Sequence, residues 1–242
     1  MVTVFLEFMV GRPYNRKGMR KGLFITVEGC DGCGKSSATQ LVVQSLMDKG
    51  YDVIHTREPG GIDIAEQIRS VILDPKNTDM EKRCEALLYA ASRRQHLVQK
   101  VLPALAEGKI VVCERFVDSS LVYQGYARGI GIDEVWNINQ FAIENHMPDL
   151  TLFMDVDYQV GLERIANRSG KDRLDIESNE FHQKVYQGYQ LVYEKFKDRM
   201  TLIDASKPLN QVVSDMVSVI EDKLNGQAKL IAKSACCFQC TK

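Results

Sequence analysis

The sequence predicts an α/β protein in which a parallel sheet of five strands is covered by helices on both faces. Short apolar, β-prone runs alternate with stretches of helical periodicity, a pattern typical of parallel sheets. Polar residues suited to chemistry follow directly after the strands, where ligands bind in such folds. The expected strands are 23–28, 52–56, 109–113, 150–154 and 200–204.

The stretches between these strands repeat their apolar residues at helical spacing. In the first of them, Leu41, Val42, Leu46 and Met47 share one face. The expected helices lie near 35–49, 62–73, 81–107, 119–127, 133–145, 157–167, 178–199 and 207–224. Asn225-Gly226 is typical of a helix stop, so we expect the last helix to end there.

The composition is that of an ordinary globular chain. Its 242 residues suffice for one α/β domain with a full core. Because 31 basic residues nearly cancel 32 acidic ones, no overall field attracts nucleic acid or a membrane surface, and we expect neither as a partner. Seven cysteines, an odd number, favour reduced thiols in a cytoplasm over a disulfide framework.

The two ends of the chain do not follow the alternation of strands and helices. Residues 1–22 are expected to be an N-terminal extension, disordered or a non-native start, ahead of one domain over 23–224. In this extension the apolar residues precede the basic ones, the reverse of a secretory signal. Residues 225–242 carry three cysteines, which could bind a soft metal, but a disordered tail is the expectation.

Residues 29–36 complete the pattern G-x-x-x-x-G-K-[ST] between the first expected strand and helix. In this context backbone N–H groups and a helix N-terminus can converge on one anion. Lys35 would reach the β- and γ-phosphates, and Ser36 would bind Mg²⁺. The pattern predicts a nucleoside triphosphate site. The expected ATP-binding residues are Gly29, Cys30, Asp31, Gly32, Cys33, Gly34, Lys35, Ser36 and Ser37.

Cys30 and Cys33 also form a C-x-x-C pair. A redox pair is the less favoured interpretation, because the residues between them already serve the phosphate loop.

A second phosphate-binding position follows the next strand, in Thr56-Arg57-Glu58-Pro59-Gly60-Gly61. A proline and two glycines set the guanidinium of Arg57 in a tight loop, and its planar fork suits a phosphate. A solvated arginine in a surface turn is the alternative, and the motif alone does not decide between them.

The third strand ends in Glu114 and Arg115, beside the expected phosphate loop. An acidic residue there is positioned to hold Mg²⁺, and Arg115 adds a second cation for phosphate. Farther along, the amide of Gln124 can pair with the imide edge of a pyrimidine. Tyr89 and Arg93, four residues apart on one helix face, can stack on a base and bond its edge.

Arg164, Arg168, Lys171 and Arg173 lie with two acidic residues, Asp172 and Asp175, in a break between helices. A charge run is usually a solvated face. Because this one interrupts a helical pattern after the fourth strand, we favour a mobile lid over about 166–176 that closes on phosphate.

In order and spacing, these motifs resemble the thymidylate kinase family from about Leu23 to Leu224, in the bacterial form that carries arginines in its lid. The resemblance implies a P-loop kinase fold with a five-stranded parallel sheet, a homodimer, and ATP-dependent phosphorylation of dTMP with Mg²⁺. It also implies a cis peptide bond before Pro59. One departure is Glu114, which stands where the family usually has aspartate.

The resemblance assigns roles residue by residue. Catalysis falls to Lys35, Arg115, Arg168 and Arg173, and the metal ligands are Ser36 and Glu114. The expected substrate-binding residues are Asp31, Arg57, Tyr89, Arg93, Ser119, Ser120 and Gln124.

Two alternatives stay open at this point. One is a kinase for another nucleoside monophosphate such as dUMP, although Arg57 disfavours a bare nucleoside. The other is a non-catalytic P-loop switch, which should carry D-x-x-G and N-K-x-D motifs that the sequence lacks.

Overall fold

The computed structural model describes residues 22–166 and 172–239. Its centre is a parallel sheet in the order β2-β3-β1-β4-β5. The strands are β1 (Leu23–Glu28), β2 (Val53–Arg57), β3 (Ile110–Glu114), β4 (Leu150–Asp155) and β5 (Met200–Asp204). Each predicted strand is confirmed to within one residue at either end, and so is the parallel arrangement.

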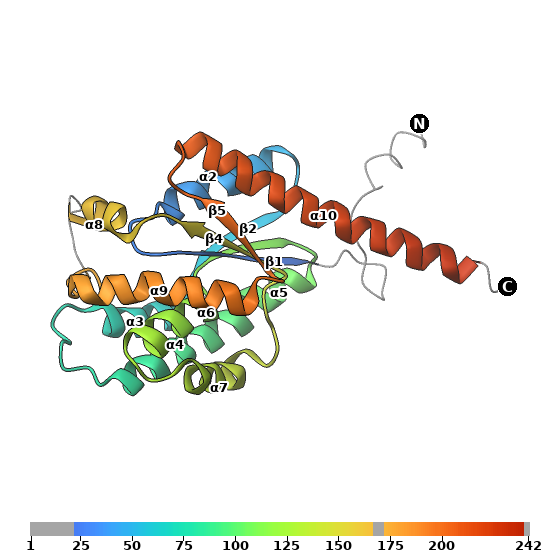
Figure 1. Ribbon diagram of the computed structural model, residues 1–242. Coiled ribbons are helices and arrows are strands. Elements are labelled where there is room, and N and C mark those ends of the chain that lie inside the picture. The colour runs from blue at the N-terminus through green and yellow to red at the C-terminus, as the bar shows by residue number, and fades with distance from the viewer. Residues whose placement is uncertain (1–21, 167–171, 240–242) are drawn as a thin grey trace.

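Helices cover both faces of the sheet (Figure 1). On one face lie α2 (Lys35–Asp48) and α10 (Leu209–Gln239), which pack on each other. The other face carries α4 (Lys82–His96), α5 (Leu102–Ala106), α6 (Val117–Ser120), α7 (Ile132–Ile143) and α9 (Asn179–Phe196). Two π-helical segments, η1 (Leu97–Val101) and η2 (Leu121–Ala127), lie on the same face. The remaining helices are α3 (Asp63–Leu73), which packs on α4, and α8 (Tyr158–Ala166).

The central strand shows why the sheet needs two covers. Every residue of β1 is buried, as expected for a strand in the middle of a parallel sheet. Phe24 belongs to the core under α4, α7 and α9, whereas Leu23, Ile25 and Val27 belong to the core under α2 and α10. The alternation of side chains along the strand therefore supplies both cores.

The last helix corrects one prediction. We expected it to stop at Asn225-Gly226, but α10 continues through both residues to Gln239. A glycine inside a helix costs only about 1 kcal/mol relative to alanine. Met216, Ile220 and Leu224, one turn apart, are buried and anchor this helix to the sheet, so a single weak position does not end it.

Other predicted features lie outside the described residues or are refined. Residues 1–21, the bulk of the expected N-terminal extension, and residues 167–171 of the expected lid are outside the description. The stretch 119–127 forms a helix as predicted, but its second part, η2, is π-helical. Such turns occur often at functional sites.

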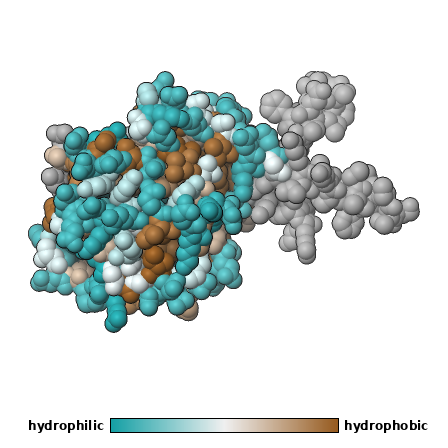
Figure 2. All heavy atoms as spheres, in the orientation of Figure 1, coloured by the Kyte–Doolittle hydropathy of each residue, from teal (hydrophilic) through white to brown (hydrophobic). Residues whose placement is uncertain are grey.

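On the face shown in Figure 2, hydrophilic side chains surround several smaller hydrophobic patches. No helix in the described part of the chain is long and apolar enough to cross a membrane.

Candidate active site

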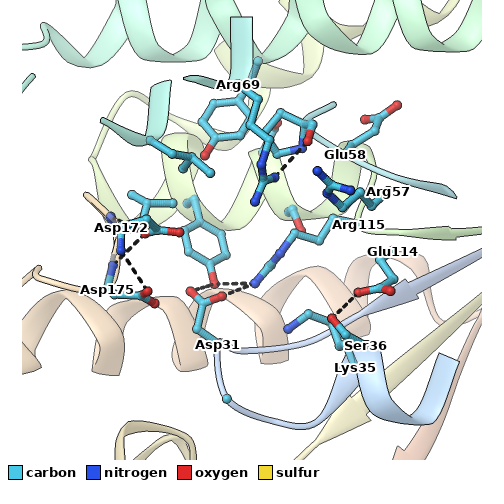
Figure 3. Close-up of a pocket in the computed structure, with 18 of the residues that line it drawn as sticks. Asp31, Lys35, Ser36, Arg57, Glu58, Arg69, Glu114, Arg115, Asp172 and Asp175 are labelled. Atoms are coloured by element: carbon cyan, nitrogen blue, oxygen red, sulfur yellow. Dashed lines mark hydrogen bonds and ion pairs between the residues drawn. The ribbon is translucent and has the colours of Figure 1, made fainter. Parts of the chain in front are cut away.

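A cavity of about 500 Å³ opens at the carboxyl ends of β1, β2 and β3. It lies between the loop that begins α2 and the walls formed by α3, α4 and η2 (Figure 3). Its charged lining residues are Asp31, Lys35, Arg57, Glu58, Arg69, Arg93, Glu114, Arg115, Arg164, Asp172 and Asp175. Six cations around one cavity suit a ligand with several phosphate groups.

The loop over residues 29–36 has the backbone that its glycines predict. Gly29, Gly32 and Gly34 all adopt positive φ, at 147°, 74° and 94°. A side chain at Gly32 would meet the backbone of Gly161 in α8 at 2.2 Å, so this position also needs glycine for close packing. Lys35 Nζ donates to the carbonyl oxygens of Gly29 at 2.8 Å and Cys30 at 2.6 Å.

Cys30 and Cys33 are both buried and both free thiols. Burial raises the pKa of Cys30 well above its usual range, so this thiol stays neutral and unreactive. The arrangement supports the phosphate-loop interpretation of the motif over the redox one.

The hydroxyl of Ser36, the carboxylate of Glu114 and the imidazole of His55 meet at the end of β3. Ser36 Oγ donates to Glu114 Oε2 at 2.6 Å, and His55 Nε2 lies 2.8 Å from Glu114 Oε1. Burial would raise the pKa of Glu114, but the hydrogen bonds from His55 and Ser36 outweigh it and lower that pKa. Glu114 is therefore an anion, and a hydroxyl beside a carboxylate is an oxygen donor set that fits Mg²⁺.

His55 is a residue that the sequence interpretation missed. It has no partner at motif spacing in the sequence. Arg57 pairs in register with Glu114, and His55 lies two residues earlier on the same face of β2. Strand alternation could thus have linked it to Glu114.

Arg115 joins the phosphate loop to the far wall of the cavity. Its φ of 65° lies in the left-handed region, which a non-glycine residue adopts only where the surroundings hold it. The guanidinium pairs with Asp31 and donates to the hydroxyl groups of Tyr123 at 3.3 Å and Tyr189 at 3.1 Å. Figure 3 shows Asp31 and Arg115 pointing toward each other across the cavity.

Burial would raise the pKa of Asp31, but Arg115 and then Lys35 lower it, and the result is about 2. Asp31 is therefore ionised and holds Arg115 in place at neutral pH. Tyr123 Oη also donates to Asp31, at 2.6 Å.

Beneath this pair lies a buried acid that the sequence interpretation did not single out. Glu28, at the end of β1, accepts hydrogen bonds from Ser119 Oγ at 2.6 Å and from the backbone N–H of Phe116 at 2.7 Å. Burial and, after it, the nearby Asp118 raise the pKa of Glu28. Ser119 is thus positioned at the edge of the cavity by Glu28.

Two arginines lie on the side of the cavity away from Lys35 (Figure 3). Arg57 is half exposed and contacts both carboxylate oxygens of Glu66, at 2.8 and 3.0 Å. Arg69, in α3, donates to the carbonyl oxygen of Pro59 at 2.8 Å. Burial and the neighbouring Arg57 lower the pKa of Arg69, so the two cations repel each other and favour an anion between them. No motif in the sequence marks Arg69 as a binding residue, because it occupies an ordinary position in a helix.

The Glu58–Pro59 peptide bond is cis, as the resemblance implied. Glu58 is buried and pairs through Oε2 with Arg93 Nε at 2.7 Å. Its other oxygen lies 2.9 Å from His96 Nδ1, whose ring in turn contacts Thr56 Oγ1 at 2.7 Å.

Arg93 is 2% exposed and almost fully engaged by protein groups. Besides Glu58, its partners are Ser120 Oγ, the side chain of Asn139 and the carbonyl oxygen of Phe116. These four bonds leave one of the five guanidinium N–H groups for a ligand. Arg93 is therefore a rigid donor at the cavity wall.

Tyr89 and Gln124, the other predicted base contacts, both line the cavity and are both buried. Gln124 Nε2 donates to Glu85 Oε1 at 2.7 Å. Glu85 was not singled out from the sequence.

The expected lid is where structure and sequence interpretation differ. Arg168 lies outside the described residues. Arg173 is 4% exposed and bonds Glu85 and the carbonyl oxygen of Ile72, so in this structure it is anchored to α3 and α4, and its catalytic role stays a prediction. Among the described cations of the charge run, Arg164 contacts the phosphate loop: its Nη1 donates to the carbonyl oxygen of Gly32 at 3.1 Å.

Asp172 and Asp175 line the cavity opposite Glu114 (Figure 3). They bond mainly to their own turn: Asp172 Oδ1 accepts from the backbone N–H groups of Leu174 and Asp175. These bonds shape the turn over residues 172–175.

Comparison with known proteins gives a consistent result. The family model described as thymidylate kinase matches residues 27–216. The thymidylate kinase of Oceanobacillus iheyensis is 56% identical over 210 residues, which is 86% of this chain and 93% of the relative. That of Geobacillus sp. is 53% identical and is covered completely. The crystal structure of thymidylate kinase from Ehrlichia chaffeensis aligns with a TM-score of 0.68 at 31% identity, over 82% of this chain and 98% of that one.

Proposed function

This chain belongs to the thymidylate kinase family and transfers a phosphoryl group from ATP to dTMP, and we propose that the transfer takes place in the cavity described above. The observation that carries this proposal is the separation of cations within one cavity. Lys35 lies on one side of the cavity, Arg57 and Arg69 lie on the other, and Arg115 lies between them (Figure 3). Two phosphate-bearing ligands can therefore face each other.

ATP is assigned to the phosphate loop. The backbone N–H groups of 29–36 and the N-terminus of α2 receive its phosphates, since a helix N-terminus carries partial positive charge. Lys35 turns from the carbonyl oxygens of Gly29 and Cys30 toward the β- and γ-phosphates.

dTMP is assigned to the other end. Arg57 and Arg69 bind its phosphate, and Tyr89 stacks on its base. Arg93 and Gln124 bond the base edge, and Ser119, Ser120 and Asp31 border the sugar and phosphate.

In the reaction, an oxygen of the dTMP phosphate attacks the γ-phosphorus of ATP, and the bond from that phosphorus to the β–γ bridging oxygen breaks. The products are dTDP and ADP. The attacking oxygen already carries negative charge, so no strong general base is needed. Catalysis then consists of positioning and of neutralising charge on the transferred group, for which Lys35 and Arg115 are assigned.

Ser36 and Glu114 would hold Mg²⁺, which supplies positive charge against the phosphates when bound. His55 fixes the Glu114 carboxylate by contact with its other oxygen. The larger Glu114, in place of the aspartate usual in the family, is thus held from two sides.

A homodimer is the proposed assembly. Val71 of α3, Leu87 of α4 and Phe141 of α7 are exposed apolar side chains on three helices that pack in sequence, and Phe141 is 89% exposed. Exposed apolar groups on neighbouring helices favour a protein–protein contact. Phe141→Glu should convert a dimer to a monomer in analytical ultracentrifugation, and a monomeric wild-type protein would contradict the assignment.

The proposed location is the cytoplasm. Cys30, Cys33, Cys84 and Cys113 are free thiols, which suits a reducing compartment.

The test is ADP release in a coupled assay with Mg²⁺-ATP and dTMP, dUMP, dCMP, dGMP or thymidine as acceptor. We expect the highest kcat/KM with dTMP. We expect no turnover with thymidine, because Arg57 and Arg69 would have no phosphate to bind. Turnover of thymidine equal to that of dTMP would contradict the assignment of the acceptor end.

A further inference from the structure

The amide of Gln124 is held in one orientation by a buried acid. Gln124 lies in η2 at the cavity wall, and its Nε2 donates to Glu85 Oε1 at 2.7 Å. Glu85, in α4, is 1% exposed, and its other oxygen accepts from Arg173 Nη2 at 2.5 Å and from Arg128 Nη2 at 3.2 Å. The carboxylate is thus fixed from three sides and cannot turn away from Gln124.

The charge of Glu85 decides which end of the amide it accepts. Burial would raise the pKa of Glu85, but Arg128 and the hydrogen bonds from Gln124 and Arg173 outweigh it and lower that pKa. An ionised carboxylate only accepts hydrogen bonds. The amide group facing it must therefore be the NH₂ group.

The carbonyl oxygen of Gln124 is left to face elsewhere. Within residues 22–166 and 172–239, the side-chain nitrogen of Gln124 has a hydrogen-bond partner, whereas the side-chain carbonyl oxygen of Gln124 has none. Because Gln124 lines the cavity, this oxygen is available as a fixed acceptor toward a bound base.

We propose that Glu85 is a positioning residue for base selectivity: by fixing the Gln124 amide, it favours pyrimidines that carry a proton on N3 over cytosine. The proposal rests on the proposed function, in which Gln124 reads the acceptor base. Thymine and uracil present N3–H, a donor that matches the carbonyl oxygen. Cytosine presents an unprotonated N3, which is an acceptor and repels that oxygen. An amide free to rotate would offer its NH₂ group to cytosine instead and would lose this discrimination.

Glu85→Gln tests the proposal, because a neutral amide at residue 85 can either accept from or donate to Gln124. We expect the ratio of kcat/KM for dTMP to that for dCMP to fall by about tenfold, the size of one ordinary hydrogen bond. The remaining discrimination comes from Arg93, whose donor suits the thymine carbonyl. The ratio of dTMP to dUMP should stay unchanged, since both bases present the same N3 edge.

The matched control is Glu177→Gln. Glu177 pairs with Arg128 at 2.6 Å but does not touch Gln124, so its loss disturbs the same arginine and leaves the amide fixed. The dTMP to dCMP ratio should be that of the wild type. A merely structural role for Glu85 would lower activity with all acceptors together and leave both ratios intact, which would overturn the proposal.

Gln124→Met provides a second test that does not require a Glu85 variant to fold. If the amide is a fixed acceptor, its removal lowers the dTMP to dCMP ratio, also by about tenfold. If the amide rotates freely, it serves either base, and its removal leaves the ratio unchanged, which would refute the proposal. In the Gln124→Met background, Glu85→Gln should have no further effect on the ratio. Failure of the wild type to phosphorylate dTMP would instead reject the proposed function itself.

Discussion

Arg173 Nε donates to the carbonyl oxygen of Ile72 across 2.7 Å, and so ties the last cation of the charge run to the end of α3. The backbone N–H of Arg173 donates to the carbonyl oxygen of Leu73 at 3.1 Å, and its guanidinium also bonds Glu85. Two backbone carbonyls and a buried carboxylate therefore anchor this residue. Arg173 is therefore a buried residue that supports Glu85 rather than an exposed one.

Replacing Arg173 by methionine should destabilise the protein. The variant leaves Glu85 buried with one cation fewer and the carbonyl oxygen of Ile72 without its donor. We expect the free energy of unfolding to fall by ~1–3 kcal/mol, measured by urea denaturation. The control is Arg83→Met, at an exposed position of α4, where the change should stay within about 0.5 kcal/mol. Equal changes in the free energy of unfolding for the two variants would mean that Arg173 is a solvated cation with no structural role.

Replacing Arg164 should have the opposite effect: it should lower turnover and leave stability unchanged. Its Nη1 contacts the carbonyl oxygen of Gly32 in the phosphate loop, and its side chain is exposed. We expect Arg164→Gln to lower turnover at saturating ATP and dTMP at least about tenfold, because it removes a cation near the transferred group. The midpoint of thermal unfolding should hardly move, since exposed charges contribute little to stability. Wild-type turnover in this variant would exclude Arg164 from catalysis.

Lys35→Ala should remove activity without unfolding the protein. The lysine neutralises charge on the transferring phosphates, and we expect ADP release to fall by roughly a thousandfold or more. Far-ultraviolet circular dichroism should match that of the wild type. Substantial turnover in a folded variant would reject the assignment of the phosphate loop.

Arg57→Ala and Arg69→Ala should both weaken binding of dTMP. Each removes a charge-assisted hydrogen bond worth about 1.5–3 kcal/mol, so KM for dTMP should rise by about 10- to 100-fold. KM for ATP should stay near the wild-type value, because the two arginines lie on the side of the cavity away from Lys35. A rise in KM for ATP alone would mean that the two ends have been assigned in reverse.

The strands and the phosphate loop could be predicted because their signals are local. Apolar runs alternate with helices, and the glycines of 29–34 precede Lys35 directly. The adoption of positive φ by Gly29, Gly32 and Gly34 follows from that motif.

The supporting groups of the site could not be predicted in the same way. Glu28 and Glu85 act through partners dozens of residues away, Ser119 for Glu28 and Gln124 for Glu85, and Arg69 donates to Pro59 in the loop after β2. The spacing of residues along the sequence does not indicate contacts between side chains that are far apart in it. The burial of Arg173 could not be predicted for the same reason. A run of cations in the sequence does not indicate which of them will form an ion pair with a buried acid such as Glu85.

The stability contributed by Asp31 should depend on pH in the acid range. Its pKa is lowered in the folded protein from an ordinary 3.8 to about 2. A lowered folded-state pKa gives stability that is fully present above the unfolded value and lost as pH falls through the folded value. The difference in unfolding free energy between wild type and Asp31→Asn should therefore be constant above about pH 5 and shrink between about pH 4 and 2. Urea denaturation across pH 2–6 measures it, and a difference that stays constant down to pH 2 would contradict the lowered pKa.

Tyr123→Phe should shift that window. The Tyr123 hydroxyl donates to Asp31 Oδ2 at 2.6 Å and favours the ionised form. Without this donor, the pKa of Asp31 in the folded protein rises toward its ordinary value. The contribution of Asp31 should then be smaller at neutral pH and should vanish at a higher pH than in the wild type. We expect the Asp31→Asn difference, measured in the Tyr123→Phe background, to approach zero before pH 2 is reached. An unchanged window would mean that Arg115 and Lys35 alone set the ionisation of Asp31.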